Sequence, residues 1–251
     1  FTYASKIEDL FSGSGSPGHR MYHHLMFTHD KSALTINPYS LQAGLEYGGD
    51  FLKASLDAQY KWSYYQDEGL KIRVFAGSFL YRESDLPWLY AFYLSGSNGS
   101  NDYTYNQTFL GRFEEPMDET ANQFLAQQFY PDQGAFALYS NLGVTRDWLA
   151  SVNISTSLPL LRDIPIKAYA NAGAFGNSRP LNIDVANRHW AYETGVQFSF
   201  LQLLDIYFPV VASNNLEKAS DLFNTRYGEK IRFHLKFNLF RPSRLLDQFD
   251  L

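Results

Sequence analysis

The chain has 251 residues and no cysteine, its net charge is −5, and aromatic residues make up 17% of it. The lack of cysteine excludes disulfides and thiolate metal sites, and an acidic chain without a basic tract is a poor partner for nucleic acid. Mean hydropathy is −0.30, and no apolar run reaches the roughly 18 residues that a transmembrane helix needs.

The residues instead follow a dyad repeat, in which apolar and polar side chains alternate. In 51–65, Leu52 and Leu56 share one face, and Lys53 and Asp57 share the other. Side chains alternate across a β-strand, so this pattern predicts a strand with one apolar and one polar face. The same alternation recurs in 147–158, 166–175, 189–201, 203–211 and 230–240. Weaker candidates for strands are 21–29, 40–48, 71–82, 87–96 and 134–142.

These segments are long, and their apolar faces tend to finish on aromatic residues such as Trp62, Trp148 and Trp190. A tilted strand needs about 9–11 residues to cross a bilayer, and aromatic rings favour the membrane boundary. We therefore predict an all-β fold: an antiparallel transmembrane β-barrel of about 12 strands, given the length of the chain. Residues 1–251 would form one outer-membrane barrel domain with a long inserted loop at 97–133.

The connections also differ in length. Gly48-Gly49-Asp50 and Gln202 mark tight turns, whereas 97–133, 176–188 and 212–229 are longer. Alternating short turns and long loops are typical of outer-membrane barrels. The chain begins at Phe1 without an initiator methionine or a signal peptide, and a barrel must be exported. We therefore expect a processed chain or the C-terminal part of a larger barrel.

Several short motifs follow one another in a fixed order: Leu110-Gly111-Arg112-Phe113, residues 150–159, Tyr169-Ala170-Asn171-Ala172-Gly173, residues 191–209 and residues 230–239. In this order they resemble the C-terminal barrel of the bacterial surface antigen superfamily. The segments at 101–112, 127–129 and 227–233 are similar to the barrel attached to gluzincin-type metallopeptidases of Bacteroidota. The resemblance covers roughly the last 150 residues and implies a barrel for outer-membrane assembly or translocation.

The resemblance also implies a loop that folds back into the lumen, carrying Gly111 and Arg112. The family has an acidic residue where this chain has Asn171, and an Arg-Gly signature where this chain has Gly111-Arg112. Glu193 is the nearest substitute for that missing charge, and so the expected partner of Arg112, because it lies on the polar face of the segment expected to pair with 166–175. The loop-plug and lumen residues are thus Gly111, Arg112, Asn171 and Glu193, although a lone arginine in an acidic loop can equally be solvated.

By parity the lumen would carry an excess of cations. The cations are Lys53, Lys61, Lys71, Arg73, Lys167, Arg232 and Lys236, against the carboxylates Glu46, Asp57 and Glu193. Such an interior suits either an acidic plug, for example 114–119, or an open pore that prefers anions.

The function expected is non-catalytic: a membrane anchor in the Gram-negative outer membrane that also serves as a plugged translocation or assembly pore. Its partners would be outer-membrane lipid, other envelope proteins or an upstream peptidase domain, with no cofactor and no metal. The alternative is an outer-membrane hydrolase, with His234 facing Ser155 or Ser199. The chain has no HExxH sequence, so peptidase chemistry of the longer relatives would lie elsewhere. A soluble β-sandwich is a third, structural reading.

Overall fold

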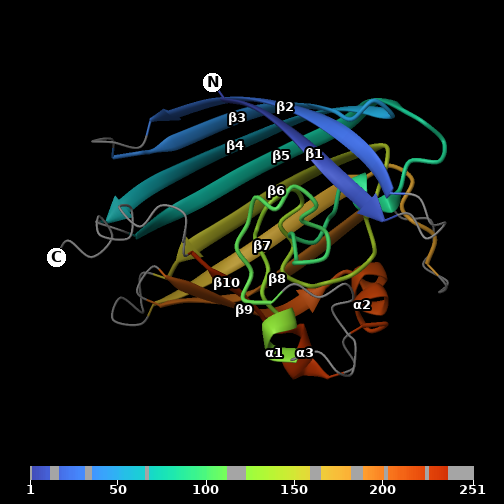
Figure 1. Cartoon of the computed structure of the whole chain (residues 1–251). Coiled ribbons are helices and arrows are strands. Elements are labelled where there is room, and N and C mark those ends of the chain that lie inside the picture. The colour runs from blue at the N-terminus through green and yellow to red at the C-terminus, as the bar shows by residue number, and fades with distance from the viewer. Residues whose placement is uncertain are drawn as a thin grey trace.

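A single antiparallel sheet organises the chain in a computed structural model, which describes residues 2–11, 17–31, 36–65, 68–111, 123–158, 165–181, 189–200, 203–223 and 226–236. The sheet has ten strands in chain order, each paired with its neighbour in sequence (Figure 1). The strands are β1 (Thr2–Phe11), β2 (Pro17–Lys31), β3 (Tyr39–Tyr47), β4 (Phe51–Tyr65), β5 (Glu68–Arg82), β6 (Trp148–Ser157), β7 (Ile166–Phe175), β8 (Trp190–Phe200), β9 (Leu204–Ala212) and β10 (Arg232–Leu235).

The helical elements are short. They are the 3-10 turn η1 (Trp88–Tyr90) and the helices α1 (Gln123–Ala126), α2 (Asn214–Ser220) and α3 (Tyr227–Lys230). None of the helices in the described part of the chain is long and apolar enough to cross a membrane.

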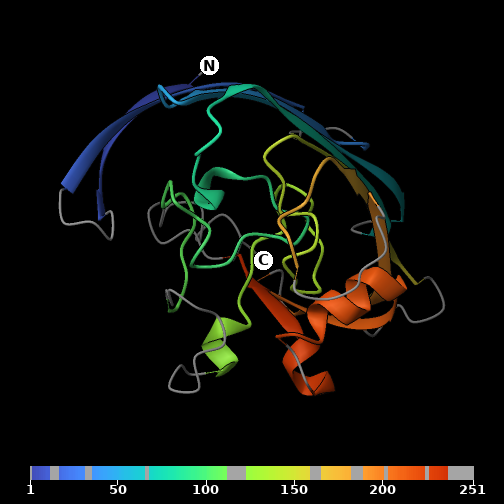
Figure 2. The ribbon, with the colours of Figure 1, turned by 90° about the vertical axis from the view of Figure 1, so that its right-hand side faces the viewer.

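The sheet curves around the connection between β5 and β6, which runs through its concave side (Figure 2). We call residues 83–111 and 123–147 of this connection the internal segment. The face of the sheet toward it is the inner face, and the opposite one is the outer face. Leu94, Phe136 and Leu138 of the internal segment are at most 2% exposed and pack against Phe75 and Leu149 of the inner face. The main hydrophobic core therefore lies between the internal segment and the inner face of the sheet. We call the sheet itself the wall.

Register separates the two faces of the sheet. Val74 of β5 pairs with Val152 of β6 on the outer face, and Arg73 pairs with Asn153 on the inner face. Because side chains alternate along each strand, this register extends the division to the neighbouring strands. The outer face is apolar and exposed, whereas the inner face combines the core contacts with polar and charged groups.

Two of the weaker strand predictions, 87–96 and 134–142, are wrong. The segment 87–96 contains η1 near its start. At the start of the segment 134–142, the φ angle is 46° at Gln133, which precedes it, and 56° at Ala135, which belongs to it. This left-handed backbone does not occur in a regular strand. A Cβ on Gly134 would also lie 2.1 Å from the carbonyl oxygen of Leu94, so the backbone there requires glycine. The apolar residues of these segments are buried because the segments lie inside the curved sheet.

The last predicted strand, 230–240, is only partly right. Lys230 belongs to α3, β10 covers Arg232–Leu235, and residues 237–240 lie outside the described residues. Among the described residues β10 pairs with β9, and Phe233 also forms a parallel bridge with Gln128 of the internal segment. In the described part of the chain, β10 does not pair with residues 21–29. These residues belong to β2, which pairs with β1 and β3.

Candidate functional site on the inner face

Four residues on adjacent strands form a continuous polar row across the inner face. Arg73 (β5), Asn153 (β6), Asn171 (β7) and Glu193 (β8) are direct register partners in turn. Arg73 Nη1 donates to Asn153 Oδ1 over 2.9 Å, and Asn153 Nδ2 donates to Asn171 Oδ1 over 3.1 Å. Asn171 Nδ2 then donates to Glu193 Oε1 over 2.7 Å. We call these four residues the polar row.

Glu193, at one end of the polar row, binds the internal segment through hydrogen bonds. Its two carboxylate oxygens accept hydrogen bonds from the backbone N–H groups of Ala137 and Leu138, at 2.6 and 2.9 Å. Glu193 is 1% exposed. Charge-assisted hydrogen bonds to backbone amides are stronger than neutral ones, and a buried amide left without an acceptor is costly. Glu193 therefore fixes residues 137–138 against the wall.

The other residues of the row bind backbone carbonyls a few positions earlier. Arg73 Nη1 donates to the carbonyl of Gln133 over 2.8 Å, and Asn153 Nδ2 donates to that of Gly134 over 2.9 Å. Arg73 also forms an ion pair with Asp57 of β4 at 2.5 Å. The polar row thus binds the internal segment along two edges of its backbone: it donates hydrogen bonds to the carbonyl groups of 133–134 and accepts them from the N–H groups of 137–138. The left-handed residues near 133–135 turn the backbone so that both edges reach the wall.

Lys53 of β4 makes a second anchor. Its ammonium group donates to the carbonyl of Tyr90 over 3.0 Å and to the hydroxyl of Tyr103 over 2.9 Å. Glu46 of β3 lies 3.5 Å from Lys53 Nζ and accepts a hydrogen bond from the same Tyr103 hydroxyl. Lys53 is 6% exposed, so a buried cation on the wall holds both an early and a later part of the internal segment.

A third set of contacts lies where the internal segment joins β6. Asp147 accepts a hydrogen bond from Arg82 Nη2 over 2.9 Å and from Asn177 Nδ2 over 2.8 Å. Burial opposes ionisation of Asp147, but the hydrogen bonds from Arg82 and Asn177 outweigh it and hold the pKa of this carboxyl below its usual range. The junction is therefore tied down by an ionised carboxylate.

Asp132 shows the opposite balance. Its carboxyl oxygens accept hydrogen bonds from the backbone N–H and the hydroxyl of Ser97, at 2.8 and 2.5 Å. Burial nevertheless raises the pKa of Asp132, and the hydrogen bonds from Ser97 only reduce the shift. These contacts join two distant parts of the internal segment to each other.

The residues predicted from the sequence are divided by the structure. Asn171 and Glu193 lie in direct contact in the polar row. Gly111 follows Leu110, whose backbone N–H donates to Gln128 Oε1 over 2.7 Å. Arg112 lies outside the described residues, so its pairing with Glu193 stays a prediction. Sequence reasoning assigned no contacts to Arg73, Asn153 and Lys53 beyond their inward direction, because it gave no path for the internal segment.

The serine–histidine alternative finds no hydrogen-bonded pair in the described part of the chain. Ser199 Oγ lies 3.2 Å from Gln197 Nε2, and the ring of His234 packs on Tyr130 with centroids 4.8 Å apart. His234 Nδ1 is buried and has no hydrogen-bond partner among these residues. Nor do they contain a group of three or more His, Cys, Asp or Glu side chains placed to hold a metal ion.

No protein-family model matches the chain, and no curated protein matches it.

Proposed function

We propose that the chain is a transmembrane β-barrel of the Gram-negative outer membrane, of the bacterial surface antigen type, with about 12 strands when closed. The internal segment acts as a plug that the polar row and Lys53 hold in the lumen. The function of the chain is non-catalytic: the chain serves as a membrane anchor and forms a plugged pore for translocation or assembly. The resemblance seen in the sequence suggests other envelope proteins or an upstream peptidase domain as partners.

The observation that carries this proposal is the composition of the outer face. Large apolar side chains stand exposed on the five successive strands β2–β6 and again on β8. They include Phe27, Leu45, Leu56, Val74, Val152, Tyr192 and Phe200, which are between 40% and 51% exposed. An exposed apolar patch larger than a few hundred Å2 marks a contact with another protein or with lipid. A face that spans the sheet while charged groups lie inside is the arrangement that a bilayer favours.

Aromatic residues bracket this apolar face. Tyr39 and Tyr47 are the two ends of β3 and are 37% and 49% exposed. At roughly 3.3 Å per residue they lie about 26 Å apart along the strand. A strand tilt of about 40° shortens that to about 20 Å of height, close to the apolar band of about 25 Å in outer-membrane barrels. Tyr60 and Trp62 continue one belt, and Trp148 belongs to the other.

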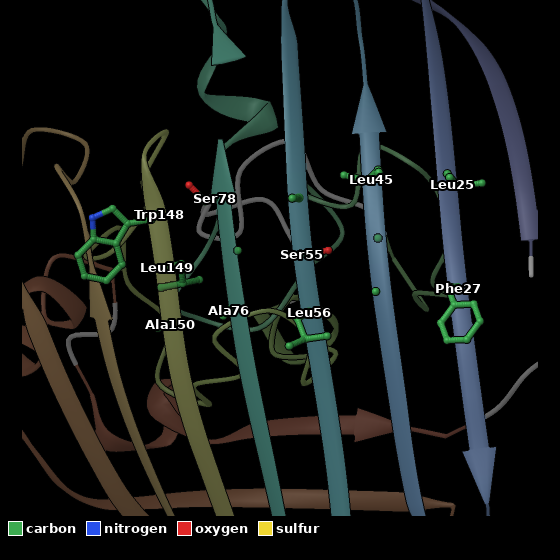
Figure 3. Close-up of a pocket in the computed structure, with 14 residues that line it drawn as sticks. Leu25, Phe27, Leu45, Ser55, Leu56, Ala76, Ser78, Trp148, Leu149 and Ala150 are labelled. Carbon is green, nitrogen blue, oxygen red and sulfur yellow. The ribbon is translucent and has the colours of Figure 1, made fainter. Parts of the chain in front are cut away.

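A shallow apolar groove of about 650 Å3 crosses the outer face over β2–β6. Figure 3 shows Phe27, Leu56 and Trp148 on alternate strands along it, with the small residue Ala76 on the strand between Leu56 and Trp148, and Ala150 on the strand of Trp148. Small side chains hollow the surface, and the larger ones border the hollow. Flexible acyl chains can fill such a relief, so the groove fits lipid contact.

Purified chain refolded in detergent and mixed with phospholipid vesicles tests the membrane proposal. We expect it to float with the vesicles, to stay bound in alkaline carbonate and to keep the strands protected from protease. Recovery of a folded chain in the aqueous fraction without detergent would contradict it and favour the soluble β-sandwich.

Conductance across a planar bilayer tests the plug. The intact chain is expected to give low conductance, because the internal segment fills the lumen. Glu193→Ala removes both acceptors for the amides of residues 137–138 and should produce larger and longer openings. Lys218→Ala, an exposed change on α2, is the control. Equal conductance for all three chains would contradict a plug held by Glu193.

A further inference from the structure

A small cavity lies between the internal segment and the inner face, beside the polar row. It has a volume of about 200 Å3. Pro131 and Ala135 of the internal segment form part of its lining. The wall contributes polar side chains, among them Gln59, Lys71, Arg73, Ser155, Tyr169 and Gln197. It is thus bordered by both parts of the molecule and is distinct from the apolar groove on the outer face.

The charges around this cavity do not cancel. Arg73 is paired with Asp57, and Lys236 is paired with Asp205 at 2.8 Å. Lys71 lines the cavity, is solvent-exposed, and lies within electrostatic range of Lys167 and Lys236 as well as of the carboxylate of Asp205. Across the strand pair β4–β5, Lys61 is the direct register partner of Lys71. Such clustering of like charges is unfavourable without a counter-ion.

Lys61, Lys71 and Lys167 have no carboxylate within ion-pair distance among the described residues, whereas Arg73 and Lys236 do. Tyr169 provides an independent sign of an unfilled requirement. It is 3% exposed, it lines the same cavity, and its hydroxyl has no hydrogen-bond partner in the described part of the chain. Buried hydroxyl groups in proteins nearly always have a partner.

We propose that this cavity binds a soluble, multivalent oxyanion of the phosphate class. The donors of the Arg73 guanidinium are already engaged, by Asp57, Asn153 and the carbonyl of Gln133. The remaining donors are therefore the ammonium group of Lys71 and the phenol of Tyr169 in the lining, with Lys61 and Lys167 nearby, and not the planar fork that suits a carboxylate. One lysine in the lining and two more beside it suit a tetrahedral ion with several charged oxygens.

The inner position of the cavity indicates a soluble ion and not a lipid headgroup. Its lining residues Lys71 and Tyr169 project from the face that carries the internal segment, opposite the apolar outer face. The inference does not depend on the bilayer, because the cavity is formed by the wall and the internal segment themselves. A ligand here would contact both and would stabilise the internal segment in place.

The site is tested by titrating the full chain with inorganic phosphate and measuring the heat of binding by calorimetry, in a detergent that contains no phosphate groups. We expect saturable binding that sulfate competes for and chloride at equal ionic strength does not. Lys71→Gln should weaken it about tenfold, the loss expected for one charge-assisted hydrogen bond. Tyr169→Phe should weaken it by a smaller factor. Lys218→Gln, which removes the same charge from α2, should leave it unchanged.

Lys71→Arg keeps the charge and is expected to retain most of the binding, which separates a lost site from a lost fold. Absence of saturable binding to the unaltered chain would overturn the proposal. So would equal weakening by Lys71→Gln and Lys218→Gln, which would indicate attraction to overall charge. Neither result bears on flotation with vesicles, so the membrane proposal and the oxyanion site can fail separately.

Discussion

The two faces of β4 carry side chains of opposite character. Leu56 on the outer face is 44% exposed and lines the apolar groove. Asp57, the next residue, is turned inward and bonded to Arg73 at 2.5 Å. One step along the backbone thus exchanges an exposed apolar group for a paired charge. In water, apolar burial would stabilise the opposite arrangement.

The comparison shows that the two faces are specified by different interactions. Outer-face side chains such as Leu56 are exposed, so the effect of a substitution there depends on the solvent that meets this face. The inner face makes individual hydrogen bonds to the backbone of the internal segment, as Glu193 does with Ala137 and Leu138. If the proposed membrane contact holds, the effect of outer-face substitutions on stability should therefore depend on lipid. Inner-face substitutions should instead loosen the attachment of the internal segment.

The largest effect is expected from a charge in the middle of the outer face. Val152 is 40% exposed and lies between Val74 and Ala172 in the register. Val152→Arg should cost about 2–4 kcal/mol of folding free energy in vesicles, because a cation is poorly solvated near the bilayer midplane. Val152→Leu is the control. Denaturant titration in vesicles measures both, and a cost for Val152→Arg below about 0.5 kcal/mol, the range of ordinary surface changes, would speak against lipid contact.

A change inside the internal segment should come next. In Gly134→Ala the new Cβ would lie 2.1 Å from the carbonyl oxygen of Leu94. Backbone atoms cannot move aside easily, so we expect a loss of about 1–3 kcal/mol, typical of overpacking. Gly228→Ala is the matched control, since nothing lies within 4 Å of its added Cβ. Thermal unfolding followed by near-UV circular dichroism checks both, and similar midpoints would contradict the close approach at Gly134.

Removal of the charge of Glu193 should have a smaller effect that is local to the inner face. Glu193→Gln keeps the shape but retains only one carbonyl for the two amides, so about 1–2 kcal/mol should be lost. Limited proteolysis near residues 133–138 should become faster while the strands stay protected. Glu217→Gln, which removes the same charge from an exposed position on α2, tests whether any loss of charge near β8 has this effect. Unchanged cleavage of Glu193→Gln would show that the polar row does not hold the internal segment.

The smallest effect is a pH dependence at the junction of the internal segment with β6. The pKa of Asp147 lies below its usual range, so its contribution is present above the unfolded pKa of about 4 and is lost as the pH falls through the lower folded value. For a partly exposed pair with Arg82 we expect about 0.5–1 kcal/mol. Unfolding measured from pH 6 to pH 2.5 should show this term, and Asp147→Asn should lack it.

Much of the wall could be predicted from the sequence, because alternation is a local property. The predicted strands 51–65 and 166–175 coincide with β4 and β7. The inward direction of Asn171 and Glu193 follows from the same parity. The all-β, antiparallel character of the sheet is confirmed. Barrel closure and the strand number stay predictions.

The path of the internal segment could not be predicted, because it depends on contacts between residues far apart in the chain. Its apolar runs at 87–96 and 134–142 resemble strands, but what buries them is the curved sheet around them. The partners of Glu193 are backbone amides, which leave no trace in the side-chain pattern. β1 was also missed, although it pairs with β2 from Thr2 to Phe11.

Single cysteines along β4 give the most direct test that the outer face meets lipid and the inner face does not. The chain has no native cysteine, so each variant at positions 54–59 carries one fluorescent probe. In vesicles containing brominated lipid, probes at Ala54, Leu56 and Ala58 should be quenched, and those at Ser55, Asp57 and Gln59 should not. Quenching that lacks this alternation, or that is absent at all positions, would contradict a membrane-spanning wall.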